Sequence, residues 1–151
     1  MTGDIARIET VSIHLEDWES GWADICVTAG PTFGSCYAFS LVWGDHFSEI
    51  EGFEEALVEG RPARIHLRGE PGAVEITATP AAPEGWARME IWLIEHAGQR
   101  TRDHVFLCRV APLAAQMRAD IPFLAKKYAK ATKRMGLLGR VAARLTRRTG
   151  G

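Results

Sequence analysis

Histidine and cysteine are the residue types in this chain that most readily act as metal ligands, nucleophiles or general bases. The sequence holds five histidines and three cysteines, which are His14, His46, His66, His96, His104, Cys26, Cys36 and Cys108. No histidine pair has the H-x-x-x-H spacing and no cysteine pair has the C-x-x-C spacing with which neighbouring side chains bind one metal ion. His104 and Cys108 share a face of an expected strand, but two ligands do not make a zinc site. We therefore predict no bound metal and no other cofactor.

The motifs of nucleophilic and phosphate chemistry are also missing. The sequence contains neither a G-x-S-x-G nucleophile elbow nor a G-x-x-x-x-G-K-[ST] phosphate loop. Residues 34–36 are typical of a turn that enters a strand, and no sequence pattern pairs two carboxylates in a pocket. We expect a protein that is not an enzyme, and the sequence identifies no small-molecule substrate. A small enzyme with a pocket lined by Trp and His is the last-ranked alternative.

Charge is divided unevenly between the two parts of the chain, although the formal net charge is only −1. Residues 1–117 carry eight arginines and eighteen carboxylates. Residues 118–151 carry ten basic side chains against one acid, Asp120, and every lysine lies at or after Lys126. Such asymmetry predicts either an electrostatic partner or docking of the basic tail on its own acidic body.

A helix predicted over residues 48–59 concentrates part of the acidic charge. Ser48 begins a capping-box pattern, and Gly60 is typical of a helix stop. Four of its glutamates cluster along the helix, which has no Lys or Arg, namely Glu51, Glu54, Glu55 and Glu59. Like charges four residues apart cost about 0.2–0.5 kcal/mol per pair. The four are therefore either a solvated face or the candidate docking face for a basic protein.

The sequence pattern of the basic tail predicts two amphipathic helical segments, one beginning at Pro122 and one after Gly136. Its basic side chains form a candidate anion-binding site, which comprises Lys126, Lys127, Lys130, Lys133, Arg134, Arg140, Arg144 and Arg147. The apolar stripe either packs on the sheet and leaves the basic face solvated, or residues 122–148 lie on a partner protein, an anionic membrane or nucleic acid. Lys, Ala and Arg dominate, which favours weak phosphate contact over recognition of bases.

Hydrophobic periodicity predicts the elements that position these surfaces. With 151 residues, of which 46% are hydrophobic, the chain is long enough for one packed domain and an appendage. Alternating apolar residues predict three strands before the acidic helix and four after it. We expect an α+β domain over residues 1–121, with a mainly antiparallel twisted sheet of about six or seven strands and one inserted helix. A basic helical extension follows over residues 122–151.

The cysteines and the N-terminus bear on the cellular compartment. Three widely spaced cysteines are a poor disulfide framework, so we expect them to be reduced and mostly buried. The first residues lack the apolar run of a signal peptide, and no uncharged apolar stretch has the length that spans a bilayer. These features predict a cytoplasmic protein.

The order of elements from Gly21 to Leu124 resembles that of the small α+β proteins of bacterial toxin–immunity loci, including the WapI-type immunity proteins. The similar parts are the hairpin of Trp22–Ala29 and Tyr37–Trp43, the acidic helix at Phe47–Leu57, strands through Ile65, Ile76 and Ile91, and a closing helix. The resemblance implies a non-catalytic inhibitor that covers the active site of a toxin. A basic toxin suits an acidic body, because complementary charge speeds association. The basic tail departs from the resemblance. It suggests the alternative of an adaptor attached through its C-terminal helices to an anionic membrane or nucleic acid.

Overall fold

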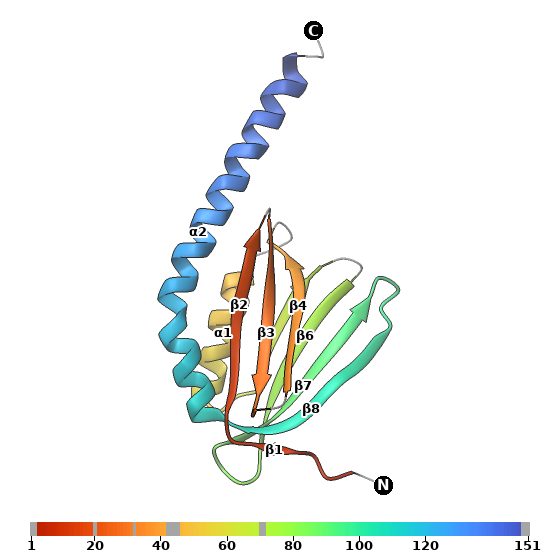
Figure 1. The fold of residues 1–151 in the computed structure, drawn as a ribbon, viewed down its shortest axis with the longest axis vertical. Helices are drawn as coiled ribbons and strands as arrows, with labels where there is room; N and C mark the ends of the chain where they lie inside the picture. Colours follow the sequence, from red (N-terminus) through yellow and green to blue (C-terminus); the bar gives the residue numbers. More distant parts are fainter. Residues whose placement is uncertain (1–2, 20, 32, 42–45, 70–71, 149–151) are drawn as a thin grey trace.

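A computed structural model describes residues 3–19, 21–31, 33–41, 46–69 and 72–148, without the side chains of residues 132 and 134–148. Eight strands and two helices follow one another along this part of the chain (Figure 1). They are β1 (Arg7–Ile8), β2 (Val11–Glu19), β3 (Trp22–Ala29), β4 (Phe33–Ser40), α1 (His46–Val58), β5 (Ala63–Arg68), β6 (Gly72–Ala81), β7 (Trp86–Glu95), β8 (Arg100–Arg109) and α2 (Val110–Arg148).

The strands form two sheets, whereas the sequence predicted one. The smaller sheet has the antiparallel order β2-β3-β4. The larger has the order β1-β8-β7-β6-β5, in which only the short pairing of β1 with β8 is parallel. The α+β class and the mainly antiparallel pairing are confirmed. The division into two sheets was missed because alternation shows which residues face inward but not which strands are neighbours.

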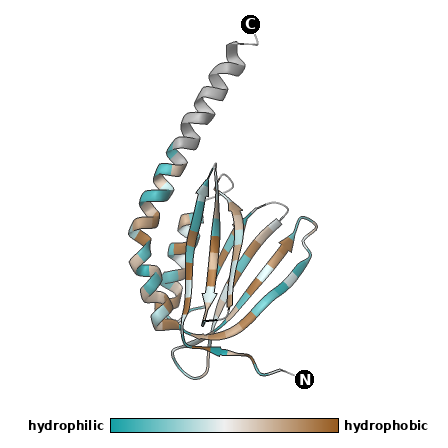
Figure 2. Ribbon diagram, viewed as in Figure 1, coloured by the Kyte–Doolittle hydropathy of each residue, from teal (hydrophilic) through white to brown (hydrophobic). Residues whose placement is uncertain are grey.

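The core is built from the inward faces of the two sheets together with α1 and the first part of α2. Figure 2 shows hydrophobic and hydrophilic residues alternating along the strands. On the inward side, Ile25 and Val27 of β3 and Ile65 of β5 are fully buried. The Phe33 ring of β4 lies 4.3 Å from the His104 ring of β8, so aromatic contacts join the smaller sheet to the larger.

The acidic helix, α1, begins at His46 and so includes the residues predicted to cap it. His46 is 3% exposed, and its Nε2 lies 2.7 Å from the carbonyl oxygen of Ser40. The buried histidine is therefore satisfied by the backbone. The predicted end of the helix is confirmed, because Gly60 has a φ of +67°, the left-handed conformation that ends many helices and favours glycine.

The basic tail belongs to a single helix, α2, of 39 residues. Its first part lies beside α1 and β2, and its C-terminal part extends beyond the sheets (Figure 1). Pro122 lies inside this helix and Gly136 does not end it, so both predicted breaks were wrong. A proline removes one backbone hydrogen bond. Tertiary packing outweighs this loss, because Leu113, Met117 and Leu124 on either side of the proline are at most 6% exposed.

The packed part of α2 continues past the domain boundary expected between residues 121 and 122. The Tyr128 ring lies 6.0 Å from that of Phe47 in α1, and Ala131 still packs against the core. Within the described residues, no helix has both the length and the apolarity needed to cross a membrane.

A side chain from α2 covers the free edge of β2. Gln116 Oε1 accepts a hydrogen bond from the Ile13 N–H at 3.0 Å, and Gln116 Nε2 donates to the Ile13 carbonyl oxygen at 3.0 Å. One side-chain amide thus satisfies both backbone groups that a neighbouring strand would otherwise pair.

The cysteines differ from expectation. Cys26 of β3 and Cys36 of β4 form a disulfide, so the prediction that they are reduced is wrong. The register of the hairpin places the two residues directly opposite each other, which their separation in sequence did not reveal. Cys108 is free and buried, as predicted.

Candidate functional site

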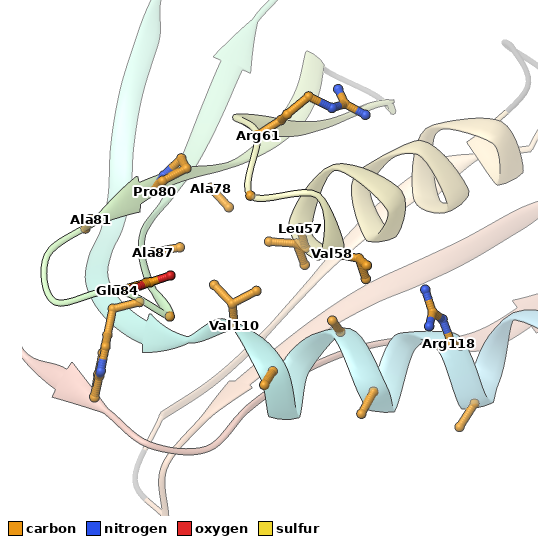
Figure 3. A pocket seen from close by; sticks show the side chains of 17 residues that line it. Leu57, Val58, Arg61, Ala78, Pro80, Ala81, Glu84, Ala87, Val110 and Arg118 are labelled. Atoms are coloured by element: carbon orange, nitrogen blue, oxygen red, sulfur yellow. The ribbon is translucent and has the colours of Figure 1, made fainter.

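A groove of about 890 Å³ opens between the end of α1, the β6–β7 turn and the first turns of α2 (Figure 3). Leu57 and Val58 of α1, Ala78 and Ala87 of the sheet, and Val110 of α2 surround it. Its volume is in the range of about 300–1,000 Å³ that is usual for ligand pockets. Val58 is 51% exposed although it is a large apolar side chain. The groove therefore offers apolar surface that a partner can bury.

Short side chains create this space. Ala111, Ala115 and Ala119 recur every four residues along α2, and so share the face that borders the groove. On the opposite side, the β6–β7 turn contains Gly85 with a φ of +88°. The Val110 N–H donates to the Gly85 carbonyl oxygen at 2.9 Å, which holds the turn against the first residue of α2.

The charged residues at the groove are Arg61, Glu84 and Arg118. Arg118 donates through Nε to Glu54 Oε1 at 2.9 Å, and Arg61 donates through Nε to Glu59 Oε2 at 2.5 Å. Among the 17 described residues that line the groove, none is a histidine, cysteine, serine or threonine. The described lining is suited to binding by apolar contact with charges at the rim, and it offers no hydroxyl, thiol or imidazole group.

The four glutamates predicted as a docking face do not all reach the surface. Glu55 and Glu59 are exposed and Glu51 is partly exposed. Glu54 is buried, with its side chain 6% exposed, and its carboxylate is bound by Arg118 of α2. Because the Glu54 carboxylate binds Arg118 and so links α1 to α2, it is not available to bind a partner protein in this arrangement. The acidic face therefore consists of Glu51, Glu55 and Glu59, beside the exposed Val58 of the groove.

The lysines of α2 point to solvent, whereas Arg118 of the same helix binds Glu54. The side chains of Lys126, Lys127, Lys130 and Lys133 are exposed. Within the described part of the chain, none of these four lysines forms an ion pair with a carboxylate. Phe123 is 59% exposed beside them, with Lys127 Nζ 5.0 Å from its ring centre. The predicted residues Arg134, Arg140, Arg144 and Arg147 have side chains outside the described residues.

A further charged cluster, which no sequence pattern predicted, lies on the outer face of the larger sheet. Its central residue is Glu75, whose side chain is 6% exposed. Arg64 Nε and Arg100 Nη2 donate to this carboxylate at 2.9 and 2.6 Å, and His66 Nδ1 lies 3.2 Å from it. Burial alone raises the pKa of Glu75. The His66 hydrogen bond and the two arginine charges outweigh burial and hold this pKa below its ordinary value of 4.5.

An indole extends the same cluster across the sheet. The Arg100 guanidinium lies 4.8 Å from the ring centre of Trp92, and Trp92 Nε1 donates to Glu90 Oε2 at 3.0 Å. Arg88 Nε also donates to Glu90, at 2.7 Å. Alternation along each strand predicts which of these side chains face outward. Their grouping depends on the register that places Glu75 beside Trp92, and no sequence pattern supplied that register.

Comparison with known protein families, with curated proteins and with solved structures found no match to this chain. The resemblance in element order to WapI-type immunity proteins stays a prediction.

Proposed function

We propose that this is a non-catalytic binding protein that holds a basic partner protein at the groove and at the neighbouring acidic face of α1. The observation that carries the proposal is the open apolar groove, with Val58 51% exposed at its edge. A concave apolar surface of this size can take an anchoring side chain, which is the kind of contact that dominates binding energy at protein interfaces.

Charge beside the groove supports a basic partner. Glu55 and Glu59 are exposed within one helical turn of Val58, and Glu51 precedes Glu55 by four residues. Acidic side chains at the edge of an interface mainly speed association with a basic protein and select against acidic ones. An inhibitor of a basic bacterial toxin, acting in the cytoplasm, would bind the toxin in the apolar groove and attract it through the acidic face.

The experiment fills the groove without adding charge. Ala115 is exposed on α2 and lines the groove, so Ala115→Trp should block it. Ala129→Trp is the matched control, because Ala129 is exposed on the same helix and is not among the groove residues. The proposal is supported if the wild type and Ala129→Trp capture the same proteins from the native host and Ala115→Trp does not. Equal capture by all three proteins contradicts it.

Attachment to an anionic surface is a second candidate function. It rests on the four exposed lysines of α2 and on the exposed ring of Phe123 among them. Basic residues with an apolar side chain are suited to an anionic membrane interface, and lysines alone are suited to phosphates. Sedimentation with anionic vesicles and a gel shift with DNA or RNA, both at physiological salt, separate these surfaces. Lack of binding in both assays would eliminate this candidate.

A further inference from the structure

Three side chains with metal-binding atoms, His14, Glu16 and Cys26, meet on the outer face of the smaller sheet, and a fourth, Cys36, is joined to Cys26 by the disulfide. None of the four lines the groove. The register pairs His14 of β2 with Cys26 of β3, and Cys26 with Cys36 of β4. The three residues therefore form one row across the sheet. Glu16 follows His14 by two residues along β2, which places it on the same face.

The donor atoms of this row are close together. His14 Nε2 lies 2.8 Å from Glu16 Oε1, and the ligand atoms of His14, Glu16 and Cys26 all lie within 4.8 Å of one another. The sulfur of Cys36 is bonded to that of Cys26. A tetrahedral zinc ion, with bonds of about 2.0 Å to nitrogen and 2.3 Å to sulfur, needs donors roughly 3–4 Å apart. Reduction would free the sulfur of Cys36, which lies outside this three-residue cluster on the neighbouring strand, and a turn of its side chain would then bring it to an ion held by the other three donors.

We propose that the reduced protein binds one Zn²⁺ through Cys26, Cys36, His14 and Glu16, and that the disulfide is the metal-free form of the same site. Two thiolates, one imidazole and one carboxylate are donors that zinc accepts in tetrahedral sites. Cys26 is 1% exposed and supplies a fixed ligand on the central strand. Cys36 and Glu16 are exposed, so an ion can enter from solvent.

The two forms interconvert by thiol–disulfide exchange. A dithiol reductant transfers two electrons and two protons to the Cys26–Cys36 bond, which breaks to give two thiols, while the reductant becomes a disulfide. Zn²⁺ then replaces one proton on each thiol, so binding releases two protons, and neutral His14 binds through Nε2. A disulfide oxidant reverses the sequence by reforming the sulfur–sulfur bond and releasing the ion. In a reducing compartment the zinc form would prevail.

The third cysteine provides an internal control. Cys108 is fully buried, and burial raises the pKa of its thiol to about 11. Because a thiolate is the metal-binding form, Cys108 does not compete for the ion. Replacing it should leave metal binding unchanged.

The test uses the full chain, reduced with an excess of dithiol that is then removed under anaerobic conditions. Titration with Co²⁺ should give a thiolate-to-cobalt charge-transfer band and the visible bands of tetrahedral cobalt, saturating at one equivalent, and Zn²⁺ should displace the cobalt. Cys36→Ser and Glu16→Ala alter exposed positions and should keep the fold, which circular dichroism checks. We expect each of them, and His14→Gln, to weaken binding at least about tenfold.

The oxidised wild type should not bind cobalt, and reduced Cys108→Ala should bind it like the wild type. The proposal is overturned if the reduced wild type gives no thiolate-to-cobalt band. It is also overturned if folded Cys36→Ser and His14→Gln bind as tightly as the wild type.

Discussion

Glu75 and Tyr37 are polar side chains whose partners lie on other strands. Glu75 is surrounded by Arg64, Arg100 and His66, and the Tyr37 hydroxyl donates to Asp103 Oδ2 at 2.6 Å. In both cases the local environment changes a pKa, and a pKa that differs between the folded and unfolded states makes stability depend on pH. The two residues give opposite pH dependences.

Glu75→Gln should lower the free energy of unfolding at pH 7 by about 1–2 kcal/mol, a small value because both arginines are substantially exposed. The folded-state pKa of Glu75 is depressed, so its contribution is present above the unfolded-state pKa and is lost as pH falls through the folded-state value. Urea unfolding at several pH values should therefore show wild type and variant converging in acid. Glu95→Gln, at an exposed position, should match the wild type throughout.

Tyr37 should resist ionisation in alkaline solution. Burial and the Asp103 hydrogen bond raise its pKa to about 12. Because the folded-state pKa is raised, the stability from Tyr37 is complete below its ordinary value of 10.0 and is lost as pH rises through about 12. Absorbance titration of tyrosinate should contain a component near this pKa, absent from Tyr37→Phe. Asp103→Asn should lower the pKa of Tyr37, and an unchanged tyrosinate titration would contradict the role of Asp103.

The pairing of α1 with α2 depends on a buried acid. Glu54 is 6% exposed and binds Arg118, which is itself 65% exposed. Removing the arginine leaves the carboxylate buried without this partner, which costs more than the loss of a surface ion pair. The same contact borders the groove, so the docking of the two helices and the shape of the candidate binding surface are linked.

Arg118→Met should therefore lower the free energy of unfolding by about 1–3 kcal/mol. Adding Glu54→Gln should recover part of this loss, because an amide is cheaper to bury than a carboxylate. The matched control is Arg109→Met, which breaks the exposed pair with Glu9 and should cost less than about 0.5 kcal/mol. Chemical denaturation gives the free energy of unfolding of the three variant proteins. Equal losses in Arg118→Met and Arg109→Met would contradict the special cost of leaving Glu54 buried without its partner.

The molecule as a whole consists of a packed body from which the C-terminal part of α2 projects (Figure 1). The packing of Leu124, Tyr128 and Ala131 against the body shows that the packed part extends well beyond residue 122. A truncation that tests the tail should therefore begin after this packing ends. Cutting at residue 122 would remove core contacts together with the lysines.

Deletion of residues 134–151 should leave the melting temperature within a few degrees of the wild type, because the packed side chains remain. By contrast, Leu124→Ala should cost about 2 kcal/mol or more, since it removes a buried side chain. Calorimetry measures the melting temperature of the truncated protein and of Leu124→Ala. A large loss of stability in the truncated protein would show that the final part of α2 belongs to the folded unit.

The sequence alone was enough for features that depend on neighbouring residues. Alternating apolar residues located seven of the strands, and the conformational freedom of Gly60 located the end of α1. The separation of the lysines from the acidic body was visible directly, and the structure shows that all four lysines are exposed. The predictions of the strands and of the helix end succeeded because periodicity and helix termination act over a few residues.

Features that depend on contacts between distant residues were decided only by the tertiary structure. The register of β3 against β4 placed Cys36 opposite Cys26, and that of β6 against β7 placed Trp92 beside Glu75. Helical spacing places Glu54, unlike Glu55, on the buried stripe of Ile50, Phe53 and Leu57, but only the docking of α2 supplied its partner Arg118. Tertiary packing also allows α2 to continue as one helix past Pro122. Local patterns show which face a residue lies on, but strand register and helix docking determine what it meets there.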